Sequence, residues 1–233
     1  MELRRGPGLS AALVGLTVTT GLIEAVCFLA LGHVFTAVMT GNLLFLAFGV
    51  AGARGLSALA SAVSFGGFTV GVVAGAAVEA RVDARRHRWF LVGLVVESLL
   101  LGAAAAAAWD LPPTGDDPSP RHLAVVAATA VAMGLRNVTT LRAHVPDLPT
   151  TIATRTLTAL LSGAAPAGGG RPVLRRTAAL GSMFGGGVLG ALMLDAGWAP
   201  QVPLLAAASA GLAIAAGYGL AVARRPPPTD RAD

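Results

Sequence analysis

Long apolar stretches separated by short polar ones run through almost the whole chain. Most of them contain about 20 residues, which is the length an α-helix needs to cross the roughly 30 Å hydrocarbon core of a bilayer. The pattern predicts an all-α polytopic membrane protein. Eight apolar segments can be distinguished, at residues 9–31, 35–53, 57–80, 89–109, 122–141, 149–163, 174–195 and 201–222.

Two of these segments are interrupted by a triplet of small or polar residues. Thr40-Gly41-Asn42 lies within 35–53, and Thr154-Arg155-Thr156 lies within 149–163. An unpaired polar group in hydrocarbon costs several kcal/mol, so such side chains face protein, water or a ligand. We therefore expect each triplet to mark a break in a helix, and we take the two triplets together as the candidate substrate site.

The positions of the arginines indicate how many of the eight segments cross the membrane. A model with eight spans and an inside N-terminus places the arginine-rich run at 81–88 outside and the acidic loop at 110–120 inside, against the positive-inside rule. If 35–53 and 149–163 enter the membrane and return, nearly all arginines fall inside, and only Arg54 and Arg121 remain outside. We therefore predict six spans plus two broken or re-entrant segments, with eight spans as the alternative.

Length supports re-entry more clearly for the second segment than for the first. Residues 149–163 reach only about 22 Å as a helix at 1.5 Å per residue, which is too short to span. The segment 35–53 is long enough to cross, so the argument there rests on the charges.

Similar motifs recur in the two halves of the chain. Gly21-Leu22 followed by Glu24 matches Gly134-Leu135 followed by Asn137, and the Phe-Gly-Gly motifs at 65–71 and 184–190 match further on, at separations of about 113 to 119 residues. With three spans in each half, the two repeats are inverted, an arrangement found in many transporters. The predicted domains are a first membrane repeat at 1–109, an extracytoplasmic loop at 110–121, a second membrane repeat at 122–223 and a disordered cytoplasmic tail at 224–233.

Glycines in these motifs recur at four-residue spacing. This small-xxx-small pattern favours close helix packing in membranes. A phosphate-binding loop needs a preceding strand, which the pattern does not predict. The glycines concerned are Gly67, Gly71, Gly75, Gly186 and Gly190.

Composition excludes several classes of protein. Charged residues make up 12% of the chain and hydrophobic ones 55%, whereas a soluble domain carries about 25% charged residues. The basic residues are all arginines, most of them in short loops, without the aromatic-rich patch of a nucleic-acid-binding protein. The single Cys27 provides neither a disulfide nor a thiolate metal site, and no histidine pair has metal-ligand spacing. No nucleophile can be named, so we expect no enzyme, metal or cofactor.

Several ionisable side chains lie within apolar segments, where they are costly and usually paired or functional. Glu24 is either a proton or cation site or the partner of Arg155 or Arg136. Glu97 is either a second proton site or an arginine partner. Arg155 indicates an anion site or a barrier to cations, or else an ion pair with Glu24. Arg136 lies near the inner end of its segment and is predicted to reach the interface.

The run from Gly21 to Leu43, with Phe35 and Met39-Thr-Gly-Asn42, resembles the YoaK-like family of bacterial membrane proteins, a domain of unknown function. The stretch Ala132–Asn137 and Pro149-Thr-Thr also resemble the family, and the similarity covers nearly the whole chain. The family usually shows Thr-Gly-Thr where this chain has Arg155 between two threonines. The resemblance implies a bacterial inner-membrane protein of roughly six helices, here with both termini cytoplasmic, and it implies no substrate.

Two functions stay open at this point. The first is a small transporter or channel for an anion or small polar solute, embedded in the lipid bilayer and compatible with a homo-oligomer. The second is a non-transporting membrane protein that acts as partner or assembly factor of another membrane complex. For the first, the predicted substrate-binding residues are Glu24, Thr40, Gly41, Asn42, Asn137, Thr154, Arg155 and Thr156.

Overall fold

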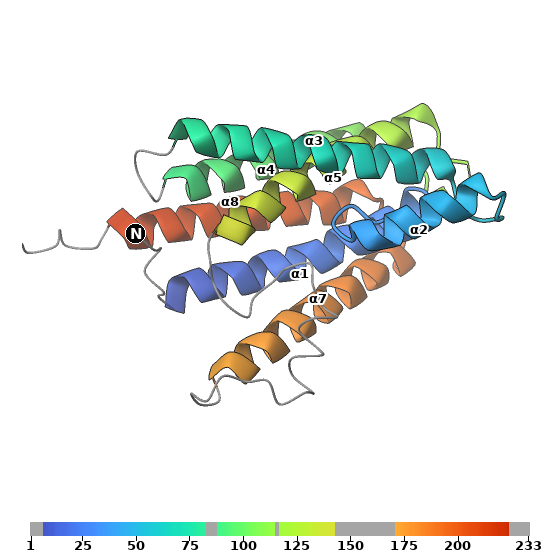
Figure 1. Ribbon diagram of the computed structural model, residues 1–233. Helices are drawn as coiled ribbons and strands as arrows, with labels where there is room; N and C mark the ends of the chain where they lie inside the picture. The colour runs from blue at the N-terminus through green and yellow to red at the C-terminus, as the bar shows by residue number, and fades with distance from the viewer. Residues whose placement is uncertain (1–6, 83–87, 115–116, 143–170, 224–233) are drawn as a thin grey trace, which may run out of the picture.

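The computed structural model describes residues 7–82, 88–114, 117–142 and 171–223, and within them the regular structure is helical (Figure 1). Six helices are long and apolar enough to cross a membrane, and a seventh has only 12 residues. The prediction of an all-α polytopic membrane protein is confirmed. The helices are α1 (Pro7–Ala30), α2 (Met39–Val50), α3 (Ala58–Val82), α4 (Arg88–Ala107), α5 (Pro120–Arg142), α7 (Arg171–Asp195) and α8 (Gln201–Ala223).

The six long helices run alternately up and down the bundle. We call the end where α1 begins the first end and the end where α1 finishes the second end. The end of α3 and the start of α4 lie at the first end, together with the end of α5 and the start of α7 (Figure 1). The arginine-rich boundaries at Arg81, Arg88, Arg142 and Arg171 are therefore at one end, and Arg54 and Arg121 are at the other.

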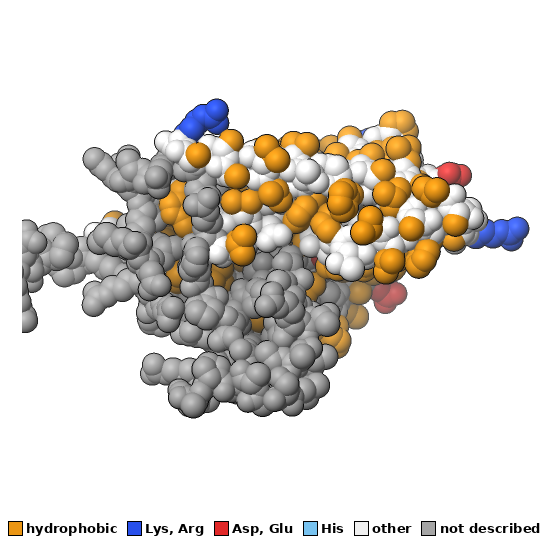
Figure 2. Space-filling view, viewed as in Figure 1, with side chains coloured by type: hydrophobic (Ala, Val, Ile, Leu, Met, Phe, Trp, Pro, Cys, Tyr) orange, Lys and Arg blue, Asp and Glu red, His pale blue; other side chains and the backbone are white. Residues whose placement is uncertain are grey.

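The outer surface between these ends is apolar. On the face shown in Figure 2, hydrophobic side chains cover the described helices and the charged ones stand near the two ends. Exposed leucine, valine and phenylalanine side chains such as Val73, Leu99 and Phe184 belong to this surface. Such a surface is suited to contact with lipid tails, because in water it would be a large exposed apolar area.

Two helix crossings bring backbones into direct contact at glycine. A Cβ atom on Gly71 of α3 would lie 2.1 Å from the carbonyl oxygen of Val131 on α5, and one on Gly186 of α7 would lie 2.0 Å from the carbonyl oxygen of Val18 on α1. Reciprocally, Gly134 meets α3 and Gly21 meets α7. A side chain at any of these positions would force the helices apart, so the predicted packing role of the glycine motifs is confirmed.

The segment after α1 turns back into the bundle. The backbone N–H of Thr114, in the loop after α4, donates to the carbonyl oxygen of Ala30 at 2.9 Å, which places Ala30 at the second end. Residues 36 and 37 nevertheless bind Glu24, which lies six residues, or about 9 Å of helix, deeper. From there α2 leads out again, and α3 begins at the same end (Figure 1). The prediction that 35–53 re-enters is therefore confirmed, whereas 149–163 lies outside the described residues.

Candidate functional site

Three charged side chains of the described spans are buried inside the bundle. Glu97 of α4 is 0% exposed, Arg136 of α5 is 2% exposed and Glu24 of α1 is 5% exposed. They come from three different helices and form two polar clusters, one around Arg136 and one around Glu24. Because charges in a bilayer are retained only with partners, the partners of each decide what the site can do.

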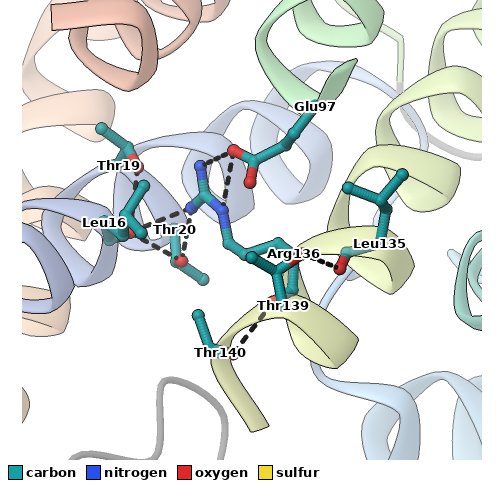
Figure 3. Close-up of polar contacts among 8 residues, drawn as sticks. All are labelled: Leu16, Thr19, Thr20, Glu97, Leu135, Arg136, Thr139 and Thr140. Atoms are coloured by element: carbon teal, nitrogen blue, oxygen red, sulfur yellow. Dashed lines mark hydrogen bonds and ion pairs between the residues drawn. The ribbon is translucent and has the colours of Figure 1, made fainter. Parts of the chain in front are cut away.

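The guanidinium of Arg136 on α5 is bonded to two other helices at once (Figure 3). Its Nε donates to Oε1 of Glu97 at 2.9 Å, and its Nη2 donates to the same oxygen. Its Nη1 donates to the carbonyl oxygen of Leu16 at 2.9 Å and to the hydroxyl of Thr20 at 2.8 Å. The guanidinium thus ties α5 to α4 through a charge and to α1 through neutral acceptors.

The threonines of α1 are arranged so that Thr20 can accept this bond. Thr20 donates its own hydroxyl proton to the carbonyl oxygen of Leu16 at 2.9 Å, and Thr17 does the same to Leu13. Such back-bonding satisfies the hydroxyl proton locally and leaves an oxygen lone pair free. Thr20 and Leu16 therefore present two oxygens, one above the other, to Arg136.

The Arg136–Glu97 pair lies near the middle of its span. Glu97 is nine residues from Arg88 and ten from Ala107, or about 14 and 15 Å along the helix. The sequence-based prediction that Arg136 reaches the interface is therefore wrong. The physical reason is that a carboxylate lies within reach of its guanidinium, so the side chain is neutralised inside the protein and has no need of the headgroup region.

One oxygen of the pair has no partner. Oε2 of Glu97 is buried and makes no hydrogen bond with the part of the chain that the structure describes. Arginine usually meets a carboxylate through two parallel bonds, one to each oxygen. Here both N–H groups converge on Oε1, so Oε2 is available to a proton or a ligand (Figure 3).

Glu24 anchors the broken segment rather than an arginine. Its Oε1 accepts from the backbone N–H of Thr36 at 3.0 Å, from the Thr36 hydroxyl at 2.9 Å and from the backbone N–H of Ala37 at 2.7 Å. Among the described residues it forms no ion pair, which rules out the predicted pairing with Arg136. The carboxylate satisfies backbone donors that the return of the chain leaves without partners.

Asn42 likewise binds the backbone of the loop, at Phe35, one residue before Thr36. Its Oδ1 accepts from the backbone N–H of Phe35 at 2.9 Å, and its Nδ2 donates to the carbonyl oxygen of Phe35 and to Ser64 of α3, the latter at 2.9 Å. Ser64 also donates to the Phe35 carbonyl oxygen at 2.5 Å. Glu24 and Asn42 together bind both backbone groups of Phe35 and the two amides that follow.

The other predicted site residues divide into three groups. Gly41 packs on Phe35, because a Cβ there would lie 3.0 Å from the phenyl ring, whereas Thr40 is exposed. Asn137 is half-buried on α5, next to Arg136. Thr154, Arg155 and Thr156 lie outside the described residues. In the structure, Glu24 of α1 and Asn42 of α2 therefore bind the same loop at 35–37. The proximity of the two triplets stays a prediction.

The two polar clusters are continuous along α1. Thr20 and Glu24 are four residues apart and share a helix face, so about 6 Å separates the Arg136 cluster from the anchored loop. An apolar cleft lies between α3, α4 and α5, on the first-end side of the pair. Two of its lining residues, Val96 and Leu135, are the sequence neighbours of Glu97 and Arg136. The cleft is lined by Gly75, Val78, Trp89, Gly93, Val96, Leu135, Val138 and Thr139.

In the described ranges, no group of histidine, cysteine, aspartate or glutamate side chains could hold a metal ion. The polar interior therefore offers hydrogen-bonding and charge, but no metal-ligand set within those ranges.

The sequence matches a family described as "Protein of unknown function (DUF1275)" over residues 12–218. The chain belongs to this family. The resemblance to YoaK-like proteins agrees with this membership. No curated protein and no solved structure gave a match. Membership in DUF1275 therefore assigns the chain a family and no activity, and the function has to be argued from the interior just described.

Sequence reasoning on this DUF1275 chain missed three parts of the site. The sequence does not single out Arg136 as the arginine partner of Glu97, and it predicts no role in the site for Thr20 or Ser64. The sequence shows an acid and an arginine inside two consecutive spans joined by one loop, but not that the two side chains meet. The threonines gave no comparable signal, since hydroxyls in membrane helices usually bond their own backbone.

Proposed function

We propose that this protein is a small transporter in the bacterial inner membrane, with an anion or small polar solute as substrate. The observation that carries the proposal is the Arg136–Glu97 pair, buried at mid-membrane and joined to hydroxyl and carbonyl oxygens of α1. A helix bundle held only by packing has no need of it, since replacing a buried ion pair with apolar residues is often neutral or stabilising.

The arrangement of the two halves supports the same proposal. The crossing of α1 with α7 repeats that of α5 with α3, and α1 and α5 run in opposite directions. Gly21 and Val18 on α1 correspond to Gly134 and Val131 on α5, each 113 residues later. Inverted halves are the architecture in which one half can rock against the other around a central site.

These contacts change the alignment of the two proposed repeats by one helical turn in the later part of each repeat. The sequence comparison paired the two Phe-Gly-Gly motifs, 119 residues apart. In the structure, the glycine of α7 that occupies the place of Gly71 is Gly186, 115 residues later, and Gly190 likewise takes the place of Gly75. Four residues therefore separate the motif alignment from the alignment by helix contacts.

The orientation follows from the arginines. Arg81, Arg88, Arg142 and Arg171 mark helix boundaries at the first end, so this end is proposed to be cytoplasmic, together with both termini. Arg155, which lies outside the described residues, stays a proposed substrate-binding residue.

The test is anion flux from proteoliposomes loaded with chloride, nitrate or formate. Wild-type protein is expected to release at least one of them faster than empty liposomes. The double variant Arg136→Gln, Glu97→Gln removes the charges while keeping the site neutral, so it is expected to fold and to lose the flux. The matched control is Arg142→Gln, at the helix end, which is expected to keep it. Absence of flux from the wild type with all three anions contradicts the proposal.

One observation favours the alternative of a non-transporting partner protein. Gly181 and Gly185 of α7 are four residues apart, and no described residue lies within 4 Å of where their Cβ atoms would be. Such a pair permits close approach of another helix. A stable co-purifying membrane protein, together with no flux from the wild type, is the result that this alternative predicts.

A further inference from the structure

We propose that an anion binds Arg136 by displacing Glu97, and that the displaced Glu97 takes up one proton, so that anion and proton move together. This inference rests on the proposed transport function and specifies its energy coupling. It follows from the geometry of the pair and from the charge that a bilayer interior accepts.

The first step concerns how Glu97 is held. Arg136 touches only Oε1, while Oε2 is buried without a described partner. An unpartnered carboxylate oxygen in a buried interior costs free energy, and a proton on that oxygen removes its negative charge. The carboxylate is therefore half-engaged, and its contact with Arg136 can be exchanged more readily than a two-oxygen pair.

The second step is the charge balance. In the structure, the guanidinium carries one positive charge and the carboxylate one negative charge, so the pair is neutral. An anion that entered beside both would leave one net negative charge at mid-membrane, which is strongly unfavourable. If Glu97 instead binds one proton as one monovalent anion binds Arg136, the site is neutral before and after. One proton per anion follows from electroneutrality.

The third step asks which other groups could take the proton. Among the described side chains of α5, the charged one that faces Glu97 is Arg136, which does not deprotonate. α1 carries Glu24, which is already bonded to three donors of the loop, and Cys27 beyond it. α8 carries only Tyr218 as a titratable group, at the first end beside Phe90. On α3 the titratable groups, Glu79 and Arg81, lie at the first end as well. Glu97 is the acid in direct contact with Arg136.

The fourth step is the class of anion. The donors that Glu97 would release are Nε and Nη2 of Arg136, while Nη1 remains on Leu16 and Thr20. Two N–H groups on one edge of a guanidinium suit a small monovalent anion with one or two acceptor atoms. A dianion would again leave a net charge. Chloride, nitrate and formate have the required charge and size, and gluconate is a bulky monovalent control.

The first experiment measures proton uptake when an anion binds. Purified protein in weakly buffered detergent is mixed with sodium chloride, nitrate or formate, and a pH indicator dye reports the protons taken up. At least one salt is expected to cause uptake of about one proton per protein, as the charge balance requires, and sodium gluconate none. Asp195→Asn, an exposed acid at the second end of α7, is the matched control and keeps the uptake.

Variants of the pair then assign the proton. Glu97→Gln leaves Arg136 without a counter-charge, so this variant is expected to bind the anion without proton uptake and independently of pH. Its melting temperature should rise on adding the anion by more than that of the wild type. Arg136→Gln should show neither effect. If Glu97→Gln takes up protons as the wild type does, another group is the acceptor and the inference is overturned.

Flux and proton uptake together separate this inference from the proposed function. Anion flux from proteoliposomes without proton uptake leaves the transporter standing and overturns the coupling. Proton uptake on anion binding without flux supports the exchange at Arg136 and overturns the transport function. No uptake with any of the three salts overturns the inference.

Discussion

Removing the positive charge of Arg136 should destabilise the protein much more than removing both charges of the pair. Arg136→Gln leaves the carboxylate of Glu97 buried without its counter-charge. It also removes four hydrogen bonds, two to Glu97 and two to α1. Breaking a buried pair in this way costs about 3–5 kcal/mol, because the remaining charge cannot reach water.

The double variant Arg136→Gln, Glu97→Gln should recover much of this loss. Two neutral amides can bond to each other across the same gap between α4 and α5, and no charge remains uncompensated. We expect the double variant to be more stable than Arg136→Gln alone by about 2 kcal/mol or more. A neutral substitution at the end of α5, Arg142→Gln, serves as the reference for an arginine outside the pair.

The assay is equilibrium unfolding in detergent, followed by circular dichroism and completed as a double-mutant cycle with Glu97→Gln. An interaction energy near zero, in which the double variant loses the sum of the stabilities lost by the two single variants, would refute the argument that the two side chains neutralise each other inside the bundle. Equal stability of Arg136→Gln and Arg142→Gln would refute its burial at mid-membrane.

Three further predictions concern the frame around this pair. Asn42→Ala removes the bonds to both backbone groups of Phe35 and to Ser64; it should cost about 2 kcal/mol at roughly 0.6 kcal/mol or more per bond in a membrane protein, measured by the same unfolding assay, and an unchanged stability contradicts the anchoring role. Gly71→Leu should disrupt the α3–α5 crossing and reduce the monodisperse fraction in size-exclusion chromatography, whereas Gly66→Leu, where no described atom lies within 4 Å, should be tolerated; similar profiles for the two speak against the close crossing. Ala84→Cys in a Cys27→Ser background should resist a membrane-impermeant thiol reagent in intact cells and react after lysis, and labelling of intact cells reverses the proposed orientation.

Much of the frame could be predicted from the sequence because it depends on local composition. Span length is set by the bilayer thickness and orientation by the arginines, so six long helices and a re-entrant first segment were expected. Glu24 and Asn42 were also identified, since polar residues next to a helix break must bond to something. Their partner is the backbone at 35–37, and neither residue was predicted to bind it.

The central pair could not be predicted because it depends on the register between helices. Glu97 and Arg136 are 39 residues apart, and they meet only because α4 and α5 pack side by side at one particular height. From the sequence, Arg136 is six residues from the end of its helix, a distance from which arginine usually reaches the headgroups. The glycine motifs show the same limit, because a shift of one turn leaves a small-xxx-small pattern unchanged.

The most direct test of the account is whether the Arg136 cluster can be reached from water on both sides of the membrane. Thr20→Cys, in a Cys27→Ser background, places a thiol beside the guanidinium, and a small anionic thiol reagent is applied to oriented vesicles from either side. Thr129→Cys, buried on α5 away from the cluster, is the control that stays unlabelled. A transporter site predicts labelling of Thr20→Cys from both sides, slowed by a bound anion. No labelling from either side would mean that the pair is sealed within the protein, and would contradict the proposed path.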